Sequence, residues 1–131
     1  MPMVANQRKV NAQKELEAKE RRRHQELSEQ YKFGIKYENG EGVVPDNAEA
    51  VKWYTKAAEQ GEAEGQRSLG LAYYTGTGVQ RDYKQAVEWH RKAAMQGLDS
   101  AQRNLGIAYY NSADVPQDYK LAYAWASLSA A

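Results

Sequence analysis

The chain has 131 residues, no cysteine, 42% hydrophobic residues and a formal net charge of +1. This length suits one domain, and the near-neutral charge provides no field that would favour nucleic acid or a membrane surface. The lack of cysteine excludes a disulfide framework and thiolate chemistry. No apolar run approaches the roughly 20 residues that cross a bilayer, so membrane insertion is not expected.

The N-terminal part of the chain is rich in charged, helix-favouring residues. Residues 8–30 contain neither glycine nor proline, and Glu15 and Lys19 have the i,i+4 spacing that stabilises a helix. Nearby glutamates offset the three arginines at 21–23. We therefore interpret the segment as a solvated helical face and expect no nucleic-acid partner. Since nothing interrupts the pattern, we expect one long helix running into Tyr37.

The rest of the chain repeats with a period of 36 residues. The residues in register are Gly34, Gly70 and Gly106, Tyr37, Tyr73 and Tyr109, Ala50, Ala86 and Ala122, and Trp53, Trp89 and Trp125. A fixed period of this length is typical of stacked-repeat proteins. We divide the chain into a charged helical extension, 1–27, and a repeat domain, 28–131. Its repeats are expected at about 28–63, 64–99 and 100–131.

Each repeat predicts an antiparallel pair of helices, so the predicted fold class is all-α. The first helices are expected at about 28–39, 64–75 and 100–111, and the second helices at about 46–60, 82–96 and 118–130. Asp46 with Glu49, and Asp82 with Gln85, have the spacing of a capping box. The turn glycines of the first two repeats are replaced in the third by Ser112 and Asp114, which predicts a different turn.

Small and aromatic residues indicate how the helices pack. Glycine inside a helix costs about 1 kcal/mol relative to alanine, so the glycines in register predict close approach between helices. In the middle repeat we expect Ala86, Trp89 and Ala93 to face inward, with the tryptophans buried. His90 occupies the position of Tyr54 in the preceding repeat and is interpreted as a residue on the helix flank.

The repeat pattern resembles the Sel-one-like repeat family, a relative of the tetratricopeptide repeats. The residues of the middle repeat that carry the resemblance are Leu69, Gly70, Tyr73, Gly76, Gly78, Val79, Asp82, Ala86, Trp89, Lys92, Ala93, Ala94 and Gly97. The resemblance covers about residues 28–131. It implies a right-handed α/α superhelix that acts as an adaptor for other proteins.

Catalytic and metal-binding signals are weak. His24 and His90 have no neighbouring ligands at metal-site spacing. The glycine-rich stretch that begins at Thr75 follows a predicted helix, not a strand, and lacks the third glycine of a dinucleotide fingerprint. We therefore expect no enzymatic activity, no cofactor and no metal.

The first candidate binding surface lies on the first helices, opposite their Leu/Tyr face. Its residues are Tyr31, Ile35, Arg67, Leu71, Tyr74, Arg103, Ile107 and Tyr110. In a two-layer solenoid this face lines the concave side, and arginine and tyrosine dominate interface energetics. We hypothesise that an acidic or aromatic-containing peptide binds there. Alternatively, the three aliphatic residues of the set only pack between adjacent inner helices.

The second candidate surface is the last expected helix. The charged outer face of the middle repeat is replaced there by Ala124, Ser127 and Leu128. A terminal repeat normally needs a polar outer face, so either a further repeat or another molecule is expected to cover this one. We expect Tyr123, Ala124 and Leu128 to contribute to a homo-oligomer contact or to a partner site. Self-association, through this helix or the N-terminal helix, is the alternative to a peptide-binding role.

The expected function is a non-catalytic scaffold for protein–protein interaction, with a protein or peptide as partner. The first residues lack the apolar core of a signal peptide, which predicts a cytoplasmic location for the chain as written. A periplasmic or secreted location stays open if the N-terminus has been trimmed.

Overall fold

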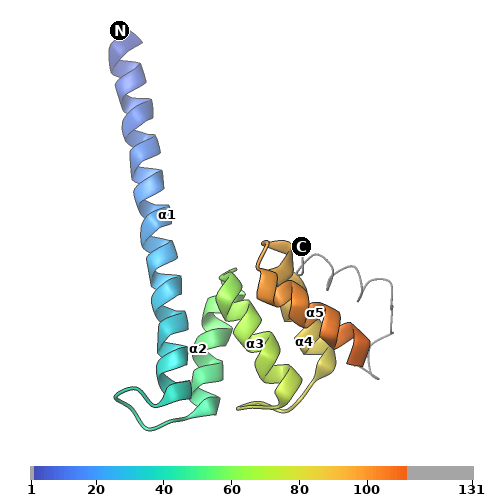
Figure 1. Ribbon diagram of the computed structural model, residues 1–131. Helices are drawn as coiled ribbons and strands as arrows, with labels where there is room; N and C mark the ends of the chain where they lie inside the picture. The colour runs from blue at the N-terminus through green and yellow to red at the C-terminus, as the bar shows by residue number, and fades with distance from the viewer. Residues whose placement is uncertain (1, 112–131) are drawn as a thin grey trace.

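A computed structural model describes residues 2–111, which form five α-helices and, within that range, no strand. The helices are α1 (Pro2–Asn39), α2 (Asn47–Glu59), α3 (Ala63–Thr75), α4 (Tyr83–Met95) and α5 (Asp99–Asn111) (Figure 1). The predicted bounds of α2 to α5 are therefore correct to within one residue. The expected helix at 118–130, the turn at Ser112 and Asp114, and the candidate contact residues Tyr123, Ala124 and Leu128 lie outside the described residues.

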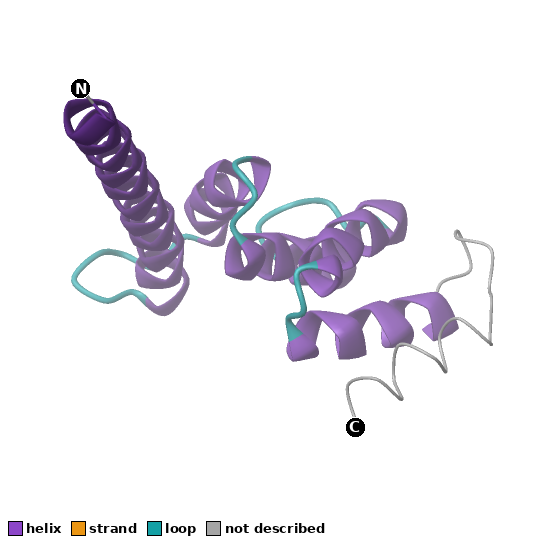
Figure 2. Ribbon diagram, turned by 90° about the horizontal axis from the view of Figure 1, so that it is seen from above, coloured by secondary structure: helices purple, strands orange, loops and turns teal. Residues whose placement is uncertain are grey.

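Consecutive helices pack against each other in antiparallel pairs, and the pairs stack along the chain (Figures 1 and 2). The all-α arrangement of repeated helix pairs, preceded by a charged helix, is confirmed. We call α1, α3 and α5 the first helices of their repeats, and α2 and α4 the second helices.

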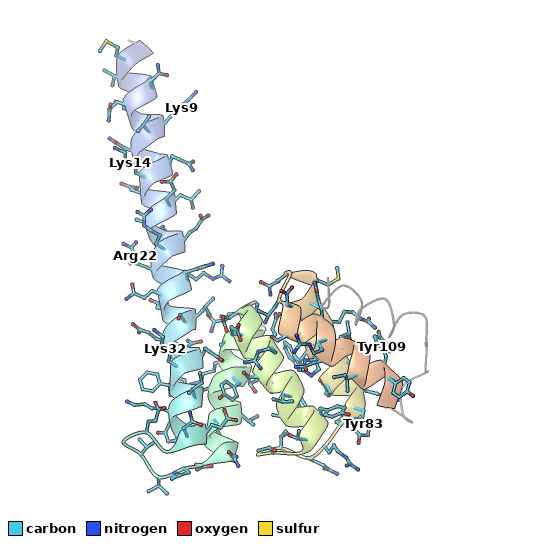
Figure 3. The ribbon with its side chains drawn as sticks, in the orientation of Figure 1. Lys9, Lys14, Arg22, Lys32, Tyr83 and Tyr109 are labelled. Atoms are coloured by element: carbon cyan, nitrogen blue, oxygen red, sulfur yellow. The ribbon has the colours of Figure 1, made fainter. Side chains whose placement is uncertain are left out.

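The prediction of one long N-terminal helix is also confirmed, since α1 runs without a break for 38 residues. Its N-terminal half extends beyond the other helices, and residues 3–17 are exposed; Lys9 and Lys14 project from this part (Figure 3). Packing begins near Arg23, whose guanidinium donates to the carbonyl of Gln60 at 3.4 Å. Leu27 is buried, with 6% of its surface exposed. This single leucine therefore anchors the segment without an apolar stripe.

The second helices begin at the predicted aspartates. The Asp46 side chain accepts a hydrogen bond from the backbone N–H of Glu49, and Asp82 accepts from Lys84 and Gln85. The reciprocal half of the predicted capping box does not form. The reason is that each aspartate N–H already donates to a carbonyl of the preceding helix, Asp46 to Tyr37 at 2.8 Å and Asp82 to Tyr73 at 2.9 Å.

Glutamine side chains form polar contacts within and between repeats, at the end of the second helices opposite to the aspartate caps. Gln60 donates to the side chain of Gln30 at 3.1 Å, and Gln96 donates to that of Gln66 at 2.9 Å. Gln66 in turn donates to the carbonyl of Ala58 at 3.2 Å and is 5% exposed. The two glutamine pairs are related by the 36-residue period, so the same polar contact recurs within successive helix pairs. The bond from Gln66 to Ala58 joins the second pair to the first.

The glycines inside the first helices lie directly against rings of the second helices. A Cβ atom at Gly34 would be 2.4 Å from Cε1 of Tyr54, and one at Gly70 would be 2.8 Å from Nδ1 of His90. Both distances are too short for any side chain. The close approach expected from the sequence is therefore confirmed for these two glycines.

The ring against each glycine is not the tryptophan that the sequence analysis placed inside. Ala86 and Ala93 are buried as predicted, but Trp89 is only half-buried, and the Lys92 ammonium lies 4.4 Å from its ring centroid. His90, one residue further, is 1% exposed. The helix-flank interpretation of His90 is therefore wrong, because its ring, like that of Tyr54, faces the glycine of the partner helix.

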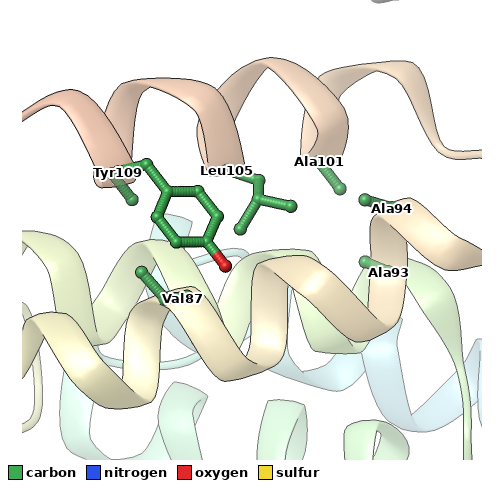
Figure 4. Packing of buried hydrophobic residues seen from close by; sticks show 7 residues of the cluster. Val87, Ala93, Ala94, Ala101, Leu105 and Tyr109 are labelled. Carbon is green, nitrogen blue, oxygen red and sulfur yellow. The ribbon is translucent and has the colours of Figure 1, made fainter. Parts of the chain in front are cut away.

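Small residues dominate the core between α4 and α5. Its members are Val87, Ala93, Ala94, Ala101, Leu105, Ala108 and Tyr109 (Figure 4). Leu105 fills the space that the alanines leave and is fully buried. The phenol of Tyr109 accepts a hydrogen bond from Arg91 at the edge of this core. The small residues of both helices therefore let α4 and α5 pack closely around Leu105.

Burial keeps the His90 imidazole uncharged. Desolvation, aided by the positive charge of Arg67, lowers the His90 pKa from 6.5 to about 4. Its Nδ1 atom makes no hydrogen bond within the described residues. A proton on this ring would place an uncompensated charge in the core, which is costly.

Replacing Gly70 by alanine tests the glycine–ring contact. We expect Gly70→Ala to lower the free energy of unfolding by about 1–2 kcal/mol, since overpacking outweighs the gain of about 1 kcal/mol in helix propensity. Urea unfolding followed by circular dichroism measures this change. In a His90→Ala background the same substitution should be neutral or stabilising. Equal losses in both backgrounds would show that the ring contact is not the cause.

The buried imidazole also predicts a pH dependence of stability. The unfolded chain binds a proton at His90 near pH 6.5, whereas the folded chain does so only near pH 4. Stability from this group is therefore complete above pH 6.5 and is lost as the pH falls towards 4. Between pH 7 and 5 the wild type should lose about 2 kcal/mol more than His90→Phe. Parallel stability profiles of the two proteins, measured by urea unfolding, would contradict this expectation.

Candidate binding surface on the first helices

The exposed side of the first helices carries a groove between α1, α2 and α3, which we call the first groove. Its volume is about 420 Å³. Tyr31 and Ile35 of α1 form one wall, Arg67 and Leu71 of α3 form the other, and Tyr54 of α2 lies between them. The two residues of each wall are one turn apart on their helix, so the helical period alone brings them to one side.

Tyr54 connects the floor of the first groove to α1. Its hydroxyl donates to the Glu38 carboxylate at 2.5 Å, and its ring lies 5.8 Å from that of Tyr31, centroid to centroid. Burial and the neighbouring carboxylate both raise the pKa of Tyr54. The phenol therefore stays protonated and keeps Glu38 in place.

Arg67 connects the two walls of the first groove. Its Nε atom lies 2.9 Å from the Glu64 carboxylate, and Nη2 donates to the Tyr31 hydroxyl at 3.4 Å. Burial disfavours the charge on Arg67, but the hydrogen bond and attraction to Glu64 outweigh it, and the pKa is raised. The guanidinium is thus a fixed cation whose charge is largely balanced by Glu64.

A second groove lies between α3, α4 and α5, with a volume of about 120 Å³. Its lining residues are Leu71, Tyr74, His90, Asn104 and Ile107. Each stands 36 positions after a residue of the first groove, namely Ile35, Glu38, Tyr54, Ser68 and Leu71. The two grooves are therefore copies of one feature, and His90 takes the place of Tyr54.

Six of the eight residues predicted for this surface line the two grooves. Tyr31, Ile35, Arg67 and Leu71 line the first groove, and Leu71, Tyr74 and Ile107 line the second. Arg103 and Tyr110, both exposed, line neither. Leu71 and Ile107 are 40% and 44% exposed, so these two are groove walls and not core residues. Ile35 is half-buried and packs against the core beneath the first groove.

The sequence analysis missed the groove floors, which the second helices contribute, and one further residue on each of α3 and α5. Tyr54 and His90 form the groove floors, and Ser68 and Asn104 lie beside them. The available signal was the glycine register, because the glycine marks where a ring of the partner helix must lie. It did not identify which residue supplies that ring.

Within residues 2–111, no three His, Cys, Asp or Glu side chains gather into a group that could hold a metal ion. Among the described helices, none combines the length and apolar character required of a membrane span.

The Sel1 repeat family model matches residues 30–62, 63–98 and 99–131. A similar solved structure is c5321, a protective antigen present in uropathogenic Escherichia coli strains that displays an SLR fold, with a TM-score of 0.76 and 44% identity. Another is a Sel1 repeat protein from Oxalobacter formigenes, with a TM-score of 0.74 and 38% identity. Each match covers 79% of this chain, but only 22% of the antigen and 43% of the Oxalobacter protein.

Comparison with curated protein sequences gives no match. Sel1 repeats generally serve as scaffolds for protein–protein interaction and are typically non-catalytic. The three matched ranges span most of the sequence, and both solved structures share the stacked helix pairs. The chain therefore belongs to the Sel1 repeat family.

Proposed function

We propose that the chain binds a segment of a partner protein across the exposed side of its first helices, with the first groove as the principal contact. The observation that carries this proposal is the groove of about 420 Å³ in which residues of three helices converge. A concave site with an apolar body and a few placed polar groups is the usual form of a ligand site.

The polar groups of the first groove are held in place before any partner arrives. The hydrogen bonds from Tyr54 to Glu38 and from Arg67 to Tyr31 fix the side chains on both walls. Binding then costs little side-chain entropy, because these rotamers are already ordered. Tyrosine and arginine are also the residue types that contribute most to interface energetics.

The charge balance of the groove bears on the choice of partner. Glu64 neutralises Arg67, and Glu38 places a carboxylate at the other end of the groove. The groove therefore favours neither a strongly acidic nor a strongly basic segment. We propose an extended segment that enters the first groove with an aromatic or apolar side chain and bonds to the polar rim.

Selection from a random peptide library tests this proposal. We expect enriched peptides to bind the wild type and to lose at least about tenfold in affinity on Ser68→Arg, because the longer side chain fills the first groove. Met95→Arg is the matched control, since Met95 is 75% exposed on α4 and lines neither groove. The proposal fails if no peptide is enriched, or if the enriched peptides bind Ser68→Arg as tightly as Met95→Arg.

A further inference from the structure

The second groove differs from the first in charge. Its wall has Tyr74 where the first groove has Glu38, and none of its five lining residues is an acid, a lysine or an arginine. The first groove, in contrast, contains both Glu38 and Arg67. A side chain that enters the second groove therefore displaces water from no carboxylate or guanidinium.

Its floor and walls are mainly apolar. Leu71 and Ile107 face the groove from α3 and α5, and about two-fifths of each side chain is exposed. His90 is 1% exposed, and its lowered pKa keeps it neutral at physiological pH. The ring centroid of Tyr74 lies 5.4 Å from that of Tyr83, which fixes the remaining wall. Asn104 is the amide among the lining residues.

The size of the second groove limits its occupant. Its volume of about 120 Å³ is roughly four times the 30 Å³ that one water molecule occupies in the liquid. A leucine or isoleucine side chain, with four carbon atoms, is comparable in size to four water molecules, whereas aromatic and arginine side chains are larger.

From the missing charge, the apolar walls and the volume, we infer that the second groove binds one branched aliphatic side chain, leucine or isoleucine, of the partner segment. This inference rests on the proposed function, because the same segment would have to cross both grooves. The second groove adds a second anchor, one repeat away from the first groove. The partner is thereby restricted to sequences with an aliphatic residue at the position that enters the second groove.

The 36-residue period supplies a matched pair of variants. Asn104→Arg places a long side chain in the second groove, and Ser68→Arg places the same side chain at the equivalent position of the first groove. Positions 68 and 104 are both half-buried, so the two substitutions carry a similar risk to folding. Circular dichroism of each variant verifies the helical fold before binding is measured.

The test is an NMR titration with N-acetyl-leucine amide, with N-acetyl-glycine amide as the control probe. We expect saturable shifts of the Ile107 methyl and His90 ring resonances with the leucine probe, at an affinity at least about tenfold higher than for the glycine probe. Asn104→Arg should abolish these shifts, whereas Ser68→Arg should preserve them.

Two other outcomes overturn the inference and can be told apart from failure of the proposed function. Shifts confined to Tyr31 and Ile35 would place the aliphatic probe in the first groove and refute an aliphatic second groove. No saturable shift at any residue would refute it as well. In either case the peptide selection with Ser68→Arg still decides the proposed function independently.

Discussion

The structure depends on the absence of a side chain at one position of α1 and one position of α3. Gly34 and Gly70 allow the rings of Tyr54 and His90 to lie against the helix backbone, at distances that no Cβ atom would permit. This contact sets the separation between the two helices within each of these pairs, α1 and α2, and α3 and α4. Protein interiors are closely packed, so a change in this separation could not be compensated by shifts elsewhere in the core. The cost of glycine in a helix is therefore offset by the burial of a whole ring.

The same contact creates the grooves. The ring that lies against the glycine forms the groove floor, and the next first helix supplies a wall residue such as Leu71. Because the floor is a core residue, its identity affects stability and surface chemistry together. Tyr54 extends a hydroxyl to Glu38, whereas His90 offers a neutral ring without a hydrogen-bond partner at Nδ1 within the described residues. One scaffold thereby presents two chemically different recesses.

The 36-residue period was enough to predict the helix order, the bounds of α2 to α5 and the glycine contacts, because these depend on local periodicity and on backbone geometry. It also predicted most of the groove walls, since residues one turn apart share a helix face. It did not predict which ring meets the glycine. Trp89 and His90 are neighbours, and a rotation of one residue, about 100° around the helix, decides which of them is buried. Helix packing sets that rotation, and hydrophobicity alone favours the wrong residue.

Polar contacts were harder to predict from the sequence, because they also depend on how the helices pack against one another. The N–H of Asp46 was expected to bond to Glu49 within its own helix, but it donates to Tyr37 of the preceding helix instead. The bond from the Gln66 side chain to the carbonyl of Ala58 likewise leaves its own helix, and it joins successive repeats. Both kinds of bond recur at the repeat period, since Asp82 donates to Tyr73 and Gln102 donates to Ala94. The first kind holds the two helices of a pair together and the second joins successive pairs, while the exposed groove residues vary. Since the register is fixed by residues outside the grooves, substitutions at the walls can change what is bound without changing how the repeats stack.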